Sequence, residues 1–486
     1  MNNNVREQNP IELWNNFADL NAVPRASKKE ERVIEFMMNF GKNLGLETYK
    51  DEVGNVIIKK PASAGMENKV VVALQSHLDM VHQKNASTNF DFDAQGIDMF
   101  VEGDWIKANG TTLGADNGIG VASIMTILAS KTIAHPPIEA LFTIDEETGM
   151  TGALGLKGGL LEGKILLNLD TEDDHELTIG CAGGIDVTGS RHYSKKTVTE
   201  GSIGLEIVVK GLTGGHSGMD IHLGRGNANK LMNRLLIEIH KEIHFEIASI
   251  DGGGLRNAIP RESRVNLAVI GDLKSQFIIK AKEIEAVFKS EYRITDPNLQ
   301  VEINEIACPE LVMEKQFQIH LLQVIHVLPN GIFRMTPGIE GLVQSSNNVS
   351  RILVKDGDLS IQCLTRSSVD SEKMDLAAMI ESAFHLLGAV TEKKGSYPGW
   401  TPQPDAAIVK LMSDLYKEVF GSEPVVNACH AGLECGILGT NYPGMQMISF
   451  GPNIRGAHSP DERVQISSVQ KYWKFLLTTL QRIPSK

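Results

Sequence analysis

Residues 70–79 read VVVALQSHLD, and this stretch decides how the chain folds. Its apolar first half, residues 70–74, is long enough for a buried strand and runs directly into a polar end that carries His77 and Asp79. Sheets of the α/β kind place ligand-binding groups beyond the carboxyl ends of their strands. His77 and Asp79 therefore predict a functional site where this strand ends.

Other segments also place acidic or imidazole side chains where an apolar element starts or ends. They are Asp116 before an apolar helix, Glu146 and Glu147 after the strand 138–144, Asp170 after the strand 164–169, and His458 in a loop punctuated by Gly and Pro. Taken alone, each has an ordinary explanation, such as a solvated strand end or a helix cap. Their recurrence at successive element ends favours one shared metal site.

Two imidazoles and three carboxylates match the ligand set of a two-metal site. Zinc and similar divalent ions bind imidazole nitrogen and carboxylate oxygen. Two ions about 3.5–4 Å apart need about five such ligands, one of them bridging, and a shared water whose pKa falls to about 7. The predicted ligands are His77, Asp116, Glu147, Asp170 and His458. Such a site can support hydrolysis of a polarised carbonyl group.

Two carboxylates beside this set are left for other roles. Asp79 can hydrogen-bond the free ring nitrogen of His77 and fix the orientation of the ring. Glu146 neighbours the ligand Glu147, but successive strand residues point to opposite sides, so its role should differ. Glu146 is therefore the predicted general base.

At 486 residues the chain is too long for a single core. Strands and a helix alternate at 70–75, 118–130 and 138–145, which predicts an α/β domain whose mixed, largely parallel sheet is flanked by helices. Beyond residue 184 the pattern becomes that of an α+β domain. We predict a discontinuous catalytic domain of residues 1–183 and 398–486, and an inserted lid of residues 184–397 that could consist of two α+β lobes.

The bulk composition excludes some classes of function. Acidic residues outnumber basic ones, 60 to 47, and the formal net charge of −13 argues against a nucleic-acid partner. The five cysteines form no C-x-x-C pair, which fits a reduced, cytoplasmic protein better than a secreted one. We expect neither a signal peptide nor a membrane-spanning segment, because no apolar run is long enough.

The quoted motifs carry a resemblance to a known family. SHLD (76–79), GADNG (114–118), DEETG (145–149), NLD (168–170) and the late His458 resemble the co-catalytic di-zinc metallopeptidases that include carnosinase and carboxypeptidase G. Within that family, NLDTED (168–173), GRGNANK (224–230) and HAGLECG (430–436) are most similar to the aminoacyl-histidine (Xaa-His) dipeptidases. The similarity runs over essentially the whole chain.

The resemblance implies two divalent metal ions. Zinc is the expected metal, and cobalt or manganese would also suit these ligands. The resemblance implies that His77 and Asp170 hold one ion, that Glu147 and His458 hold the other, and that Asp116 bridges them. It also implies a cis peptide after Asp116, Asp79 as the residue that orients His77, and Glu146 as the base.

The resemblance further implies substrate contacts in and near the lid. His216, in GGHSG (214–218), would stabilise the developing oxyanion. Arg366 would bind the free carboxylate of the substrate, and Asn257 matches a lid asparagine of the relatives. Glu434 would bind the free α-amino group.

The expected function is that of a cytoplasmic metallodipeptidase that cleaves unblocked dipeptides, including carnosine-type Xaa-His substrates. The alternatives are a related tripeptidase, aminoacylase or desuccinylase, and a non-catalytic metal-dependent binding protein. Monomer and homodimer both stay open, and so does the question of whether His216 serves the site of its own chain.

Overall fold

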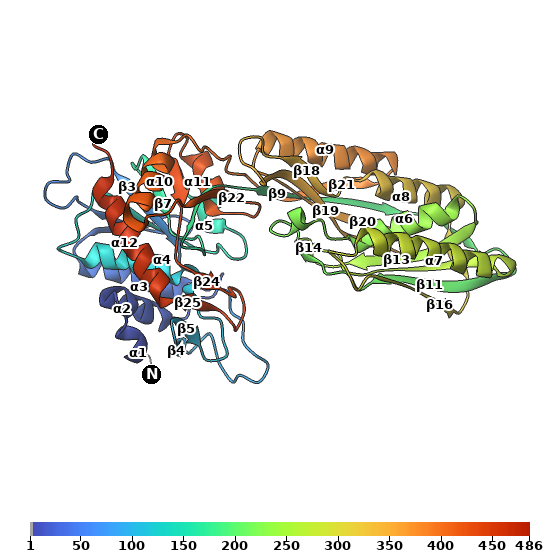
Figure 1. Cartoon of the computed structure of the whole chain (residues 1–486), viewed down its shortest axis with the longest axis horizontal. Coiled ribbons are helices and arrows are strands. Elements are labelled where there is room, and N and C mark those ends of the chain that lie inside the picture. Colours follow the sequence, from blue (N-terminus) through green and yellow to red (C-terminus); the bar gives the residue numbers. More distant parts are fainter. Residues whose placement is uncertain (1–2) are drawn as a thin grey trace. The chain divides into compact units, whose positions relative to one another are not determined.

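The computed structural model describes residues 3–486 and divides the chain into two compact units (Figure 1). Unit 1 comprises the described residues up to Gly180, together with Trp400–Ala428 and Leu433–Lys486; unit 2 comprises Cys181–Gly399 and Cys429–Gly432. The short segment Cys429–Gly432 was expected in the first domain. It lies in unit 2 because the Ala182 N–H donates to the carbonyls of Cys429 and Ala431, at 3.2 and 3.0 Å. The roles of catalytic domain and lid stay predictions.

Unit 1 is built on a mixed sheet that contains eight strands within the described residues. In spatial order they are β1 (Glu47–Lys50), β2 (Val56–Lys60), β6 (Ile138–Thr143), β3 (Val72–His77), β7 (Ile165–Asn168), β23 (Gln446–Ser449), β8 (Glu176–Cys181) and β22 (Val425–Cys429). The four central strands pair in parallel, whereas β1, β2 and β8 pair antiparallel with their neighbours. Every residue of β3, β6 and β7 is buried, as expected for strands covered on both faces.

Helices cover this sheet, and a small second sheet lies beside it. The helices of unit 1 are α1 (Asn3–Arg6), α2 (Ile11–Asn21), α3 (Glu31–Asn43), α4 (Ala115–Ala129), α5 (Thr151–Gly155), α10 (Ala407–Phe420), α11 (Glu434–Asn441) and α12 (Ile466–Arg482). The small sheet consists of β24 (Ile454–Arg455), β25 (Arg463–Gln465), β5 (Trp105–Ala108) and β4 (Met99–Glu102). Helix α4 packs against β3 and α2, and it is buried along most of its length because its sequence is apolar on every side.

Unit 2 is built on one antiparallel sheet. Its described strands are β16 (Gln300–Ile306), β11 (Ser202–Lys210), β15 (Ser263–Ile270), β13 (Phe245–Gly253), β19 (Val343–Lys355), β20 (Asp358–Ser367), β9 (Gly183–His192) and β21 (Val390–Tyr397), with β18 (Gly331–Met335) paired to β19. Short pairs are formed by β10 (Lys195–Thr197) with β17 (Leu311–Met313), and by β12 (Gly215–His216) with β14 (Ala258–Ile259). Pairing of β13 with β19 joins the two suggested lobes into one continuous sheet.

Four long helices cover one face of the unit 2 sheet (Figure 1). They are α6 (Ala228–His240), α7 (Lys274–Glu291), α8 (Lys315–Val327) and α9 (Asp370–Leu386), and the short 3-10 turns are η1 (Ile221–Leu223) and η2 (Gly271–Leu273). Their apolar sides and the inward strand residues form a single core cluster. Unit 2 is therefore a two-layer α+β structure.

Candidate metal centre and active site

The strand ends of unit 1 gather the predicted ligands. Strand β3 ends at His77, and it pairs in parallel with β6 and with β7, so these carboxyl ends lie at one edge of the sheet. Glu146 and Glu147 follow β6 by a few residues, and Asp170 follows β7. The regular sheet thus delivers residues from distant parts of the sequence to one place.

Asp116 lies between two groups of side chains. Its Oδ1 is 3.1 Å from His77 Nε2, which is also 3.4 Å from Asp170 Oδ1. Its Oδ2 is 3.2 Å from His458 Nε2, which is 2.9 Å from Glu147 Oε2. The ligand atoms of each group lie within 4.8 Å of one another, so each trio is a candidate metal site and Asp116 is common to both. The peptide bond between Asp116 and Asn117 is cis.

The charges of this cluster suit divalent cations. Hydrogen bonds to Asp116 and then to Glu147 raise the pKa of His458 to about 11. Burial alone would lower the pKa of His77, but the charge of Asp170 and hydrogen bonds to three aspartates, Asp116, Asp170 and Asp79, raise it well above its ordinary value. Glu147 Oε1 is buried and has no hydrogen-bond partner among the described residues. Two ions ligated by nitrogen and oxygen would balance the carboxylates and give this orphaned oxygen a partner.

Asp79 holds two parts of the site at once. Its Oδ1 lies 3.3 Å from His77 Nδ1, and its carboxylate accepts the N–H groups of Glu146 and Glu147 at 3.1 and 3.2 Å. The side chain is fully buried, and the Ser27 hydroxyl donates to it at 2.8 Å. A single carboxylate thereby fixes the ring of His77 and the backbone that carries the two glutamates.

Glu146 is a desolvated carboxyl beside the ligands. One of its oxygens lies within 4.8 Å of ligand atoms of His77 and Glu147. Burial raises the pKa of Glu146 well above its ordinary value; His77 opposes this shift, and the charges of Asp170 and Glu434 add to it. A carboxyl with a raised pKa can take up a proton and release it, as a general base must.

Glu434 is the first residue of α11 and contacts side chains of β3 and β6. Its Oε2 accepts hydrogen bonds from Gln75 Nε2 and Thr143 Oγ1, both at 2.6 Å, and its Oε1 has no partner in the part of the chain that the structure describes. Burial raises the pKa of Glu434 to about 8. The side chain is completely buried. The role of Glu434 toward a substrate stays a prediction.

Sequence reasoning missed two buried charges next to the ligands. Arg25 is fully buried and donates to the carbonyls of Leu78, Asp79 and Gly114, at 3.0, 3.1 and 2.6 Å. Glu462 accepts backbone N–H groups from the segment that carries Asp116. Both residues act on backbone groups, which leaves no residue pattern to detect. The only hint in the sequence is an acidic residue four positions after His458.

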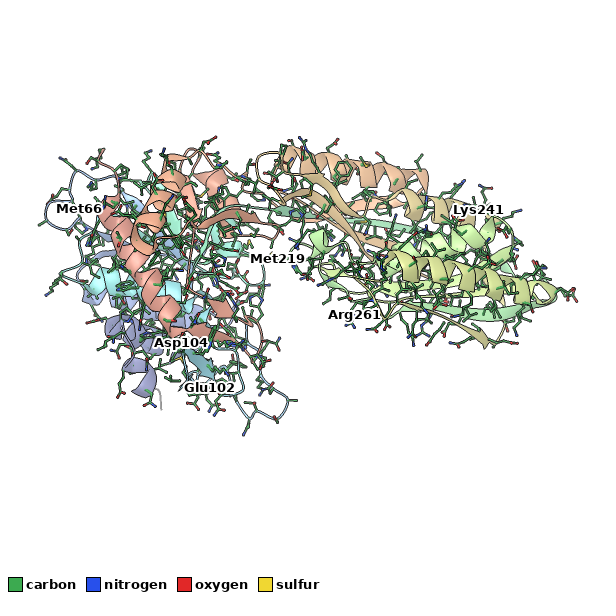
Figure 2. All side chains as sticks on the ribbon, in the orientation of Figure 1. Met66, Glu102, Asp104, Met219, Lys241 and Arg261 are labelled. Atoms are coloured by element: carbon green, nitrogen blue, oxygen red, sulfur yellow. The ribbon has the colours of Figure 1, made fainter. Side chains whose placement is uncertain are left out.

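His216 belongs to unit 2, where its ring is held in one tautomer. The N–H groups of Gly218 and Met219 lie 3.1 and 3.0 Å from His216 Nδ1. Because Nδ1 accepts these hydrogen bonds, the ring proton must be on Nε2. Burial and then the charge of Arg366 lower the pKa of His216, which keeps the ring neutral. The side chain of Met219 beside it is exposed (Figure 2).

Arg366 lies on β20 and is almost fully buried. Its Nη1 donates to the Tyr397 hydroxyl at 2.9 Å, and its Nε has no partner within residues 3–486. His430 Nε2 lies 2.7 Å from Ser346 Oγ, and burial, then Arg366, lower the pKa of His430 to about 3. Asn257 is exposed, and its carbonyl accepts the Ser217 N–H at 2.7 Å, next to His216.

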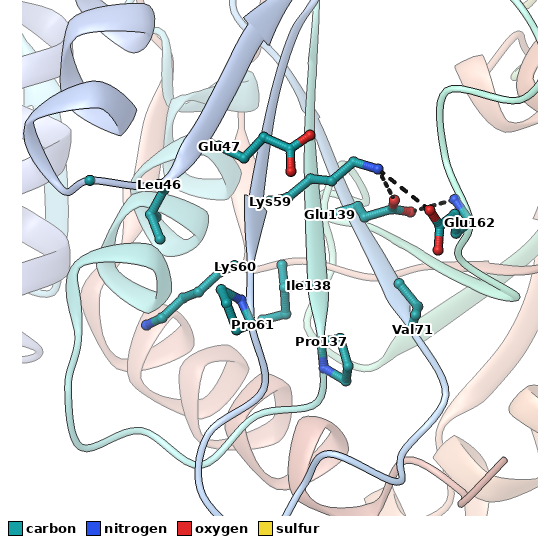
Figure 3. A pocket seen from close by; sticks show the side chains of 11 residues that line it. Leu46, Glu47, Lys59, Lys60, Pro61, Val71, Pro137, Ile138, Glu139 and Glu162 are labelled. Atoms are coloured by element: carbon teal, nitrogen blue, oxygen red, sulfur yellow. Dashed lines mark hydrogen bonds and ion pairs between the residues drawn. The ribbon is translucent and has the colours of Figure 1, made fainter.

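A cavity of roughly 370 Å³ lies elsewhere in unit 1, around the start of β6 (Figure 3). Lys59 Nζ is 3.0 Å from Glu139 Oε1, and Glu139 Oε2 accepts the N–H groups of Glu162 and Gly163. Lys60 donates to carbonyls at the end of α4. The charged side chains of Lys59, Lys60 and Glu139 thus already have partners, and no histidine of the described chain lines the cavity, so it is not a competing candidate for the metal site.

A mixed sheet that collects imidazoles and carboxylates at one edge is typical of metal-dependent hydrolases. The chain belongs to peptidase family M20/M25/M40, whose sequence model matches residues 73–482. The family predicted from the sequence motifs is therefore confirmed. No helix among the described residues is both long and apolar enough to cross a membrane.

Individual relatives cover nearly the whole chain. A protein of Escherichia coli (strain K12) named cytosol non-specific dipeptidase is 41% identical over 482 residues, which are 99% of each chain. The crystal structure of an aminoacylhistidine dipeptidase from Vibrio alginolyticus matches with a TM-score of 0.93 and 42% identity, over 99% of this chain and 98% of that one. A tripeptidase from Staphylococcus aureus, at 15% identity and a TM-score of 0.57 over 98% and 99%, shares the fold alone. The predicted fold class is confirmed.

Proposed function

We propose that the chain is a metal-dependent dipeptidase of the cytoplasm that hydrolyses unblocked dipeptides, Xaa-His dipeptides among them. The observation that carries this proposal is the position of Asp116 between two trios of ligand side chains, with the desolvated Glu146 beside them. The names of the E. coli and Vibrio relatives, and their similarity over the whole chain, support the substrate class and the cytoplasmic location.

The residues of unit 1 would hold the ions and move a proton. His77 and Asp170 would bind one ion, Glu147 and His458 the second, and Asp116 both; the ions are proposed to be zinc, with cobalt or manganese as substitutes. Bound there, such ions supply an acidified water and polarise the carbonyl of the scissile peptide. Glu146 would take a proton as the water oxygen bonds to that carbon, and would give it to the amine nitrogen as the C–N bond breaks.

The residues of unit 2 would recognise and stabilise the substrate. His216 carries its ring proton on Nε2, because Nδ1 accepts two backbone N–H groups. Nε2 could therefore donate a hydrogen bond to the oxyanion that forms from the scissile carbonyl. Arg366 has donors left for a free carboxylate, and Asn257 adjoins the His216 loop. In unit 1, Glu434 would offer its unpartnered oxygen to the α-amino group. The oligomeric state stays undecided between monomer and homodimer.

Initial rates on a substrate panel test the proposal. Apoprotein is supplied with zinc, cobalt or manganese and offered dipeptides, including carnosine, as well as tripeptides and N-blocked amino acids. Free dipeptides should be the fastest substrates, and exhaustive chelation should abolish turnover. Faster cleavage of tripeptides or blocked amino acids would refute the dipeptidase assignment, and full activity after chelation would refute the metal centre.

A further inference from the structure

Glu462 gathers four consecutive backbone N–H groups of the segment that carries Asp116. Its Oε2 accepts from Leu113 and Gly114 at 2.7 and 2.9 Å, and its Oε1 accepts from Ala115 and Asp116 at 2.8 and 3.3 Å. The side chain is only 2% exposed. Both oxygens are occupied by these donors, so Glu462 is not itself a free metal ligand.

The segment 113–116 lacks any local substitute for this carboxylate. Its last two residues, Ala115 and Asp116, open helix α4, but the backbone of Asp116 and Asn117 is not helical. Gly114, the residue before the helix, has a φ of 70° and offers no side-chain cap. Buried N–H groups that regular secondary structure leaves without an acceptor must find one elsewhere in the chain. Glu462 supplies that acceptor from a part of the chain more than three hundred residues away.

The same side chain is close in sequence to the second ligand loop. Between His458 and Glu462 the chain makes a tight turn, in which the Ser459 N–H donates to the Gly456 carbonyl at 3.2 Å and the Glu462 N–H to the Ser459 carbonyl at 3.0 Å. His458 itself has a φ of 63°. A turn held this closely moves as one piece, so a shift of Glu462 would also shift the ring of His458.

Arg25 completes the connection to the third ligand. It donates to the Gly114 carbonyl on the Asp116 segment and to the carbonyls of Leu78 and Asp79, which directly follow His77. The backbone around Asp116 is therefore held by two residues. Its N–H groups donate to the Glu462 carboxylate, and the Gly114 carbonyl accepts from Arg25.

We propose that Glu462 is a positioning residue that locks the Asp116 segment to the His458 turn, so that the two metal subsites are formed together. This inference rests on the proposed function, because it assumes that Asp116 and His458 bind metal. It adds a residue that touches neither substrate nor ion and whose effect is to set the distance between two ligands.

Glu462→Gln tests the proposal, with Asp461→Asn as the matched control. Gln keeps the size of the side chain, but its NH₂ group faces N–H donors and cannot accept from them. Asp461 is the exposed neighbour and loses the same charge without losing these hydrogen bonds. Metal dissociation constants are measured on apoprotein by competition of zinc with a chromophoric chelator, and thermal unfolding of the apoproteins is followed in parallel.

Glu462→Gln should bind zinc about 10–100-fold more weakly, as is usual when a residue behind the ligands is lost. Asp461→Asn should bind zinc as the wild type does. A folded Glu462→Gln variant with wild-type zinc affinity would overturn the proposal, even if its apoprotein unfolds at a lower temperature. If Glu462→Gln does not fold, Glu462→Asp, which shortens the reach by one methylene, takes its place under the same criterion. If neither variant folds, Glu462 is a folding residue and the proposal is wrong. Failure of the proposed function would be seen separately, as wild-type protein that binds no zinc or cleaves no dipeptide.

Discussion

The two units carry polar clusters of opposite character. In unit 1 the cluster is dominated by carboxyl groups, and burial raises the pKa values of Glu146 and Glu434. In unit 2 the cluster contains the buried Arg366 and two imidazoles whose pKa values are lowered, the half-buried His216 and the buried His430. Unit 1 therefore needs added cations, whereas unit 2 is suited to an anion or to a group that becomes negative during a reaction.

This contrast predicts that unit 1 binds cations and that unit 2 stabilises negatively charged groups. A surplus of buried carboxylates is tolerated only when cations or protons neutralise it. Neutral imidazole donors and a partly unpaired guanidinium are complementary to carboxylates and to developing oxyanions. Loss of a unit 1 residue should thus affect metal binding or proton transfer, whereas loss of a unit 2 residue should leave the metal content unchanged.

The largest effect is expected from Glu146→Ala compared with Asp116→Ala. Loss of the base should lower kcat by about 10²–10⁴-fold while the metal content stays at the wild-type level. Asp116→Ala removes a group common to both trios and should lose metal. Steady-state rates and metal analysis of the purified variants check this, and equal metal loss in the two variants would contradict the division of roles.

His216→Ala should lower kcat by about 10²–10³-fold, because an oxyanion donor is lost. The metal content should not change, since His216 belongs to unit 2. His222→Ala is the matched control, because His222 is exposed and lies in the same loop region. The same drop in both variants, or metal loss in His216→Ala, would break the contrast between the units.

Arg366→Gln should reduce kcat/KM for free dipeptides by about 10–100-fold, which corresponds to the loss of a hydrogen bond to a charged group. A dipeptide amide has no carboxylate, so kcat/KM for this substrate should fall much less. Arg264→Gln removes an exposed arginine of the same sheet, which pairs with Glu206, and serves as the control. An equal loss of kcat/KM for the dipeptide and for its amide would show that Arg366 does not bind the carboxylate.

The smallest effect concerns the stability of unit 2 in acid. Burial and the charge of Arg366 lower the pKa of His430 to about 3. The unfolded chain, in which histidine titrates near 6.5, binds this proton first, so the contribution of His430 to stability is present above about pH 6.5 and is lost as the pH falls.

Between pH 7 and pH 5 the wild type should lose about 2 kcal/mol more of its unfolding free energy than His430→Asn. Urea unfolding of both proteins at the two pH values measures this difference. Groups of unit 1 titrate in both proteins and cancel in the comparison. Identical pH dependence would mean that His430 is free to take up a proton in the folded state.

The sequence predicts the parts of the site that sit on regular elements. His77, Glu146, Glu147 and Asp170 follow apolar strands, and parallel pairing is enough to bring them to one edge. Asp116, in the first turn of α4, and His458, in a loop, do not follow strands. They joined the predicted set because acidic and imidazole residues recur at element ends, and the family resemblance then gave each a role. The roles of these residues stay predictions, although the structure brings the side chains of unit 1 together.

The contact between Asp79 and the His77 ring, which joins two side chains, was predicted. The contacts that hold the site through the backbone could not be predicted. Arg25 donates to backbone carbonyls, and Asp79 and Glu462 accept from backbone N–H groups. The side chains of the residues that they contact take no part in these hydrogen bonds. Such contacts depend on loop geometry, which no pattern of apolar and polar residues encodes. The single sheet of unit 2 was missed for a similar reason, since the pairing of β13 with β19 joins two strands with no local turn between them.

The position of β23 has a consequence for how the protein is made. This strand pairs with β7 in the middle of the unit 1 sheet, yet Asn168 leaves the ribosome long before Gln446 is synthesised. Until then the nascent chain exposes the free edge of β7, a surface open to mispairing with other chains. All of unit 2 is synthesised during that wait, so its early folding would keep the intervening polypeptide compact while the half-finished sheet waits for its last strands.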